Sequence, residues 1–72
     1  MVTWGERLRQ LRTEENLRQK DLANELNVNE RTIQYYEANK HEPNMKLIRY
    51  ACKRFNVSAD YLLGLSDERK SL

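Results

Sequence analysis

The hydrophobic residues of this chain recur at intervals of three and four positions, and no stretch alternates for long between apolar and polar residues. Such spacing is typical of amphipathic helices, which bury one face and expose the other. It predicts five short helices, at about residues 4–15, 19–26, 30–38, 45–55 and 59–64. The expected fold class is all-α, with a compact five-helix domain over residues 1–65 and a frayed tail at residues 66–72.

Most of the predicted helices follow a side chain that can accept a backbone N–H from the first turn. These capping residues are Thr3, Asn29, Asn44 and Ser58. Arg18 precedes the helix at 19–26 and is a poor cap, because its cation lies at the positive end of the helix dipole. Asn27 can adopt the left-handed conformation that ends this helix.

The apolar faces of these helices form a single core. The expected inward residues are Trp4, Leu8, Leu11, Leu22, Ala23, Leu26, Ile33, Tyr36, Leu47, Ile48, Ala51, Cys52 and Phe55. Residues 19–38 contain two short helices joined by a tight turn, and the helices of such a pair cross at about 90–120°. Helices that approach this closely need a small residue at the contact, and Ala23 fits that position.

Residues 4–64 resemble the Cro/Xre-type helix-turn-helix domain of phage repressors and many bacterial regulators. The resemblance rests on three stretches that occur in register: RQKDLANELNV at 18–28, YEANKHEP at 36–43 and FNVSADYLLG at 55–64. It implies a lambda-repressor-like fold of five helices that binds double-stranded operator DNA as a dimer and regulates transcription. The helix at 30–38 is then the recognition helix.

Four positions depart from the pattern of that family. Arg18 stands where the family usually has a serine or threonine cap, and Asn27 and Asn39 stand where it usually has glycine. Asparagine is the second choice after glycine for the left-handed conformation, so these two changes are mild. Ala38 lacks the polar side chain that often meets a phosphate at its position, which removes one expected contact.

In this architecture the recognition helix enters the major groove with its N-terminal end first. Helical spacing places Glu30, Arg31, Gln34 and Tyr35 on its outer face, with Thr32 beside them. Arg31 can bond to guanine and Gln34 to adenine, each through two hydrogen bonds. Glu30 can accept from cytosine N4, and Thr32 or the Tyr35 ring can touch a thymine methyl group. The alternative is a solvated helix face with no ligand.

Phosphate contacts are expected on either side of the recognition helix. The resemblance makes Gln19 a phosphate contact at the start of its helix, where backbone N–H groups attract anions. It also places the loop after the recognition helix against the sugar-phosphate backbone. The full set of expected DNA-binding residues is Arg18, Gln19, Asn29, Glu30, Arg31, Thr32, Gln34, Tyr35, Asn39, Lys40 and Lys46.

The resemblance implies two further structural features. Arg12 is expected to pair with Glu37 in a partly buried position and to orient the recognition helix. The alternative is two independent surface charges.

The last helix and the residues after it carry more large apolar residues than one small core can hold, so the expected dimer interface is Tyr61, Leu62 and Leu65. The homodimer is expected to be weak in free solution.

Composition narrows the range of functions without identifying one. The net charge of +2 is only a weak sign of an anionic partner. No apolar run reaches the about 20 residues of a membrane span, and the N-terminus lacks the apolar stretch of a signal peptide. One cysteine, Cys52, and one histidine, His41, exclude an internal disulfide and a zinc finger, and this cysteine usage favours a reducing cytoplasm. The family resemblance implies that the protein is bacterial or phage-encoded.

Two classes of function remain. The first is a sequence-specific transcriptional regulator, a repressor that binds an inverted-repeat operator. The alternative is a protein-interaction module, such as an antitoxin or a repressor-sequestering subunit, which Glu30 and Ala38 slightly favour. An enzyme is not expected, because no catalytic constellation, metal site, cofactor site or small-molecule effector site is evident. The sequence leaves open the operator and whether further chain follows Leu72.

Overall fold

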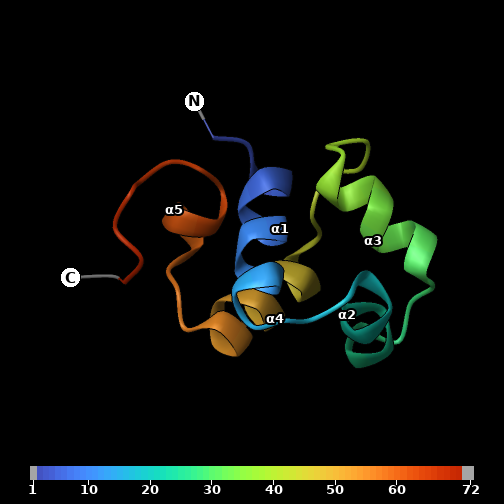
Figure 1. Ribbon diagram of the computed structural model, residues 1–72. Helices are drawn as coiled ribbons and strands as arrows, with labels where there is room; N and C mark the ends of the chain where they lie inside the picture. Colours follow the sequence, from blue (N-terminus) through green and yellow to red (C-terminus); the bar gives the residue numbers. More distant parts are fainter. Residues whose placement is uncertain (1, 71–72) are drawn as a thin grey trace.

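A computed structural model describes residues 2–70 and shows five helices in that range (Figure 1). They are α1 (Trp4–Glu14), α2 (Gln19–Leu26), α3 (Glu30–Glu37), α4 (Met45–Phe55) and α5 (Ala59–Leu62). The all-α, five-helix class is thus confirmed. The bounds of α2 and α4 equal the predicted ones, whereas α1, α3 and α5 end one or two residues earlier than expected. In the described part of the chain, no helix is long and apolar enough to cross a membrane.

The helices begin and end at polar residues that satisfy free backbone groups. Side chains of the four predicted capping residues each accept a backbone N–H from the first turn of α1, α3, α4 or α5, over 2.8–3.2 Å. Four asparagines adopt the left-handed conformation, with φ between 56° and 61°, and all four lie just after a helix: Asn16, Asn27, Asn39 and Asn56. Asparagine tolerates this conformation better than other residues with a side chain, so the helix ends are encoded locally.

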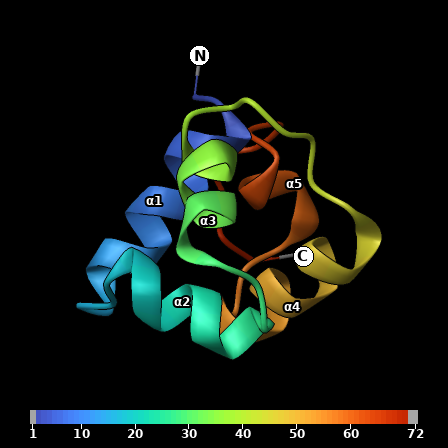
Figure 2. The same ribbon diagram turned by 90° about the vertical axis from the view of Figure 1, so that its right-hand side faces the viewer.

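The core lies where α1 meets the α2–α3 pair on one side and α5 on the other (Figure 1). Leu8, Leu22, Ile33 and Leu62 have no exposed surface, and Ala23 is almost as buried. α2 and α3 pack closely, as the small side chain of Ala23 permits. All of the expected inward residues are buried or half-buried, and α3 is left with one side facing away from the core (Figure 2).

Two of the three residues of the predicted dimer interface lie in the core of this domain. Leu62 is fully buried and Tyr61 is 5% exposed, because both pack against other core residues. Tyr61 also lies under the guanidinium of Arg7, 3.7 Å from the ring centroid, and accepts a hydrogen bond from Gln10. Leu65 is 75% exposed and is the one member of the predicted set that a partner could reach.

The segment at residues 66–70, which the sequence predicts to be frayed, makes several contacts with the rest of the fold. The Arg69 guanidinium pairs with the Glu14 carboxylate over 2.6 and 2.8 Å and lies 5.3 Å from the Tyr61 ring centroid. The Ser58 backbone N–H donates to the Arg69 carbonyl oxygen. Residues 71 and 72 lie outside the described part of the chain.

A second charged cluster joins α4 to α2 and to the end of α1. The Arg54 guanidinium contacts Glu15 at 2.6 Å and Glu25 at 2.9 Å, and the Tyr50 hydroxyl donates to Glu25. Arg54 and Tyr50 lower the pKa of Glu25, while burial and the neighbouring carboxylate raise the pKa of Tyr50 to about 12. These bonds fix α2 on the side that lies away from α3.

The docking of the tail has a consequence at low pH. The hydrogen bonds from Arg69 and then Gln10 lower the pKa of Glu14 from 4.5 to about 2. Because the folded pKa of Glu14 lies below its unfolded pKa, the contact stabilises the fold above about pH 4.5 and is lost as the pH falls toward 2.

In a side-chain NMR titration we expect Arg69→Gln to raise the pKa of Glu14 toward 4.5. The matched variant Lys70→Gln should leave the pKa of Glu14 low. A Glu14 pKa near 4.5 in the wild type would show that the tail does not contact α1.

Candidate nucleic-acid interface

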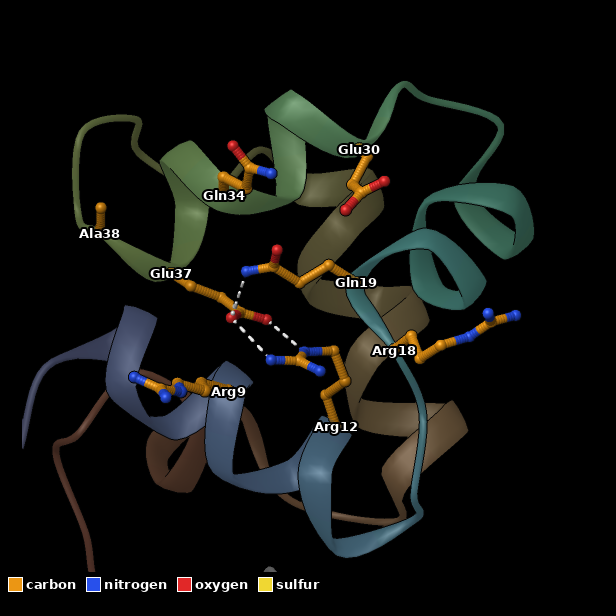
Figure 3. Close-up of a pocket in the computed structure, with 8 residues that line it drawn as sticks. All are labelled: Arg9, Arg12, Arg18, Gln19, Glu30, Gln34, Glu37 and Ala38. Carbon is orange, nitrogen blue, oxygen red and sulfur yellow. Dashed lines mark hydrogen bonds and ion pairs between the residues drawn. The ribbon is translucent and has the colours of Figure 1, made fainter.

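An open groove of about 690 Å³ lies between α1, the start of α2 and α3 (Figure 3). Three arginines and two glutamines make up most of its lining: Arg9, Arg12, Arg18, Gln19 and Gln34. Glu30, Glu37 and Ala38 complete it. Of the eleven predicted DNA-binding residues, four line this groove. The others lie on α3 or in the loops that flank it, except Lys46, which lies on α4.

A buried ion pair forms the floor of this groove. Nε and Nη2 of Arg12 donate to the two carboxylate oxygens of Glu37 over 2.6 and 3.0 Å, and their side chains are 10% and 5% exposed. The pair that the resemblance implies is therefore present. Arg12 also donates to the Leu17 carbonyl oxygen at 2.7 Å, and Gln19 donates to Glu37 at 3.1 Å (Figure 3). This cluster connects α1, the first residue of α2 and the last residue of α3.

The start of α2 is stabilised without a capping side chain at Arg18. The Arg18 backbone N–H donates to the Asp21 carboxylate at 2.8 Å, and the Arg18 guanidinium pairs with the same carboxylate over 3.0 and 3.1 Å. These bonds from Arg18 lower the pKa of Asp21 to about 2. Asp21 thus supplies half of a capping box, which offsets the unfavourable Arg18 cation. The Arg18 side chain stays 74% exposed and points away from the buried pair (Figure 3).

The outer face of α3 carries side chains that are free to meet a ligand. Glu30, Arg31 and Gln34 are exposed, and Thr32 and Tyr35 are half-buried. Within residues 2–70, neither the Arg31 guanidinium nor the Gln34 amide makes a hydrogen bond or ion pair. The two residues are three positions apart, so they lie on the same side of the helix. This arrangement leaves two side chains that suit bidentate base contacts pointing outward from a fixed helix.

Two predicted DNA-binding residues are used inside the fold. The Asn29 side-chain oxygen accepts from the Thr32 backbone N–H and hydroxyl, both at 2.9 Å, so it caps α3. The Asn39 oxygen accepts from the Gly5 backbone N–H at 3.0 Å, and its amide nitrogen donates to the Thr3 hydroxyl at 2.9 Å. Asn39 therefore serves the first turn of α1, and its side chain is not the free phosphate contact that the sequence predicts.

Gly5 explains how α1 comes so close to the end of α3. A Cβ at this position would lie 2.8 Å from the Asn39 side-chain oxygen and 2.8 Å from the Glu37 carbonyl oxygen. Both distances are too short for carbon and oxygen atoms, so a side chain at Gly5 would push α3 away from α1. The absent Cβ and the Asn39 hydrogen bonds together fix the C-terminal end of α3.

The two predicted lysines lie at the edges of this face. Lys40 follows Asn39 in the loop after α3, is exposed, and has its Nζ 5.8 Å from the Tyr35 ring centroid. Lys46 is exposed in the first turn of α4. Neither ammonium group pairs with a carboxylate within the described residues.

Sequence reasoning missed one cation of the groove. Arg9 is exposed on α1 and lines the groove, with Gln34 and Ala38 on the opposite wall (Figure 3). The sequence could have indicated its position, because Arg9 precedes Arg12 by three residues and must lie on the same side of α1. The pattern of apolar residues alone gave no reason to separate Arg9 from the other surface cations.

The double task of Asn39 can be tested by two substitutions. Asn39→Ala removes both hydrogen bonds to the start of α1 and places a strained residue at φ 61°, so we expect it to lower the free energy of unfolding by about 2–4 kcal/mol. Asn39→Gly removes the same bonds, but glycine tolerates the left-handed conformation. Its free energy of unfolding should therefore be about 1 kcal/mol higher than that of Asn39→Ala. Urea denaturation measures both values. Equal stability of the two variants would contradict the conformational part of this explanation.

With this geometry established, the fold and the site define a helix-turn-helix domain, and comparison with known proteins gives the same result. The family described as "Helix-turn-helix domain" matches residues 5–68. The chain therefore belongs to the helix-turn-helix family of the Cro/Xre type. A crystal structure of the P22 c2 repressor protein in complex with a synthetic operator is similar to this fold, with a TM-score of 0.81 and 30% sequence identity. That match covers 92% of this chain and 100% of the P22 c2 chain.

Curated relatives carry the same family name. The HTH-type transcriptional activator BcrR of Enterococcus faecalis is 42% identical over 63 residues, which is 88% of this chain and 31% of BcrR. The HTH-type transcriptional regulator ImmR of Bacillus subtilis (strain 168) is 32% identical over 69 residues, 96% of this chain and 54% of ImmR. The chain thus spans about a third to a half of the length of these two relatives.

Proposed function

We propose that this chain is a sequence-specific DNA-binding domain of a transcriptional regulator, and that α3 is its recognition helix. The observation that carries the proposal is the exposed pair of Arg31 and Gln34 on a helix that the buried Arg12–Glu37 cluster holds in place. Bidentate donors on a rigid helix are what recognition of base edges in the major groove requires. The P22 c2 repressor, which has a similar fold, binds a synthetic operator in its crystal structure.

The groove and the flanking loops supply the phosphate contacts of this proposal. The start of α2 carries Gln19 and the exposed guanidinium of Arg18, beside backbone N–H groups that favour anions. Arg9 adds a cation from α1, and Lys40 and Lys46 add cations on the far side of α3. These contacts position the domain on the duplex, while base contacts come from α3. Thr32 and the Tyr35 ring would then meet thymine methyl groups.

Two copies are needed to read a complete operator. One recognition helix covers only half a site, and dimers of this class bind half-sites about 34 Å apart on one face of the DNA. We infer a homodimer that is weak in solution and strengthened on an inverted repeat. Leu65 is the residue of the predicted interface that remains available, because its side chain is 75% exposed.

The proposed effect on transcription is repression. A domain bound in the major groove over a promoter excludes other proteins without any further contact, whereas activation needs a second specific surface. BcrR is named as an activator and the P22 c2 protein as a repressor, so a reporter assay with the selected operator placed over a promoter decides the direction. Higher reporter output in the presence of the protein would contradict repression.

Selection from a random double-stranded DNA library at near-physiological salt tests the proposal directly. We expect enrichment of an inverted repeat whose half-site centres lie about one helical turn apart. Weak, salt-sensitive binding with no enriched sequence would contradict sequence-specific recognition. That result would favour the protein-interaction module, to which the Glu30 carboxylate on the outer face of α3 is better suited.

Three variants separate base contacts from phosphate contacts on the selected site. Arg31→Ala and Gln34→Ala should each reduce discrimination at particular base pairs, by about 1–3 kcal/mol. Lys40→Ala should weaken binding to all sequences alike and reduce the salt slope by about 1. Lys53→Ala removes an exposed cation on α4 and is the matched control. Fluorescence anisotropy measures all four, and a uniform loss in Arg31→Ala would contradict its role in base recognition.

A further inference from the structure

Four aromatic rings form a continuous chain between the start of α1 and the outer face of α3. Trp4 contacts Tyr36 with ring centroids 5.3 Å apart and planes at 67°. His41 contacts both Tyr36, at 6.2 Å and 73°, and Tyr35, at 5.1 Å and 74°. All three contacts have the edge-to-face geometry that aromatic pairs prefer. His41 is therefore the link between the half-buried Tyr36 and the ring of Tyr35.

The end of α3 explains how a loop residue reaches this position. The Lys40 N–H donates to the Tyr35 carbonyl oxygen at 2.8 Å and the Asn39 N–H to the Tyr36 carbonyl oxygen at 3.0 Å, which is the Schellman pattern. Asn39 supplies the left-handed residue that this pattern needs. The reversed chain places Lys40 and His41 beside the last turn of α3, so the Tyr35 ring has both residues close to it.

We propose that His41 is a positioning residue for DNA recognition, which acts by holding the Tyr35 ring in the orientation in which it meets a base. This inference rests on the proposed function and assigns a role to a loop residue outside the predicted set. A tyrosine on an exposed helix face can rotate about two side-chain bonds, and each contact that restricts it lowers the entropy lost on binding. His41 supplies such a contact from a loop that Asn39 ties to α1.

The geometry favours positioning over a direct contact between His41 and phosphate. The imidazole ring of His41 lies against two aromatic rings, and the cation nearest to Tyr35 in the same loop is Lys40. Lys40 already provides a positive charge for the DNA phosphate backbone on this side of α3. His41 is exposed, so its replacement opens no cavity in the core and the variants should fold.

A double-mutant cycle on the selected operator tests the proposal. The variants are His41→Ala, Tyr35→Ala and the double variant, with His41→Phe as the control that keeps a ring but removes hydrogen bonding and charge. Each variant is measured by competition anisotropy against single-base variants of the operator. Thermal unfolding of each variant shows whether it retains the fold.

We expect His41→Ala to reduce discrimination by about two- to twelvefold, the range of one aromatic pair, at the base pair that Tyr35→Ala identifies. Discrimination at the Arg31 and Gln34 positions should not change. His41→Phe should keep the wild-type preference, and His41→Ala should have no further effect in the Tyr35→Ala background. This pattern would support positioning, because loss of general stability does not select one base pair.

Three results would overturn the proposal. Unchanged discrimination in His41→Ala, while the wild type reads sequence, contradicts positioning and leaves the proposed function intact. An equal loss for all sequences in both His41→Ala and His41→Phe identifies a direct phosphate contact instead. A wild-type protein with no base preference would end the proposed function and this inference together.

Discussion

The buried contact between Arg12 and Glu37 is the interaction on which the rest of the structure depends. Its two charges lie almost out of contact with water, where an unpaired charge would be strongly unfavourable. The carboxylate also accepts from Gln19, and the guanidinium also donates to the Leu17 carbonyl oxygen, so most of their hydrogen-bonding capacity is used. A buried pair of this kind adds little net stability, but it has one low-energy geometry. That geometry sets the position of α3 relative to α1 and α2.

Several local devices act on the same helix. Asn29 caps its start, the Schellman pattern closes its end, and Asn39 ties that end to the first turn of α1. Gly5 permits the close approach of the two helices. Together these contacts fix the backbone of α3 and leave its outer side chains facing away from the core. A small domain can thus hold one helix face exposed and in a fixed position without a large core behind it.

The sequence predicted the features that depend on neighbouring residues. Helix bounds followed from capping side chains and from asparagines that adopt the left-handed conformation, both of which act within a few residues. Inward positions such as Leu8 and Ile33 followed from spacing, because one face of each short helix must meet the core. The Arg12–Glu37 pair came from the family resemblance, since no local pattern joins residues 25 positions apart.

The features that sequence reasoning missed depend on contacts between distant segments. Leu62 is buried and Leu65 is exposed because α5 packs against α1, and nothing in the sequence near these two leucines shows which of them faces the core. Arg69 joins the C-terminal segment to α1, and its partner Glu14 is 55 positions away in the sequence. Asn39 looked like a surface amide until the fold brought Gly5 beside it. Burial of a cation against an aromatic ring, as for Arg7 over Tyr61, also depends on the tertiary arrangement.

The most direct test of this account is the coupling energy between Arg12 and Glu37, measured by urea denaturation of Arg12→Met, Glu37→Leu and the double variant. Each single variant leaves one buried charge unpaired, so each should lose about 3–5 kcal/mol of unfolding free energy. The double variant should lose no more than either single variant, because it removes both charges. If the loss in the double variant equals the sum of the two single losses, the side chains of Arg12 and Glu37 act independently. That result would contradict the claim that the rest of the structure depends on this pair.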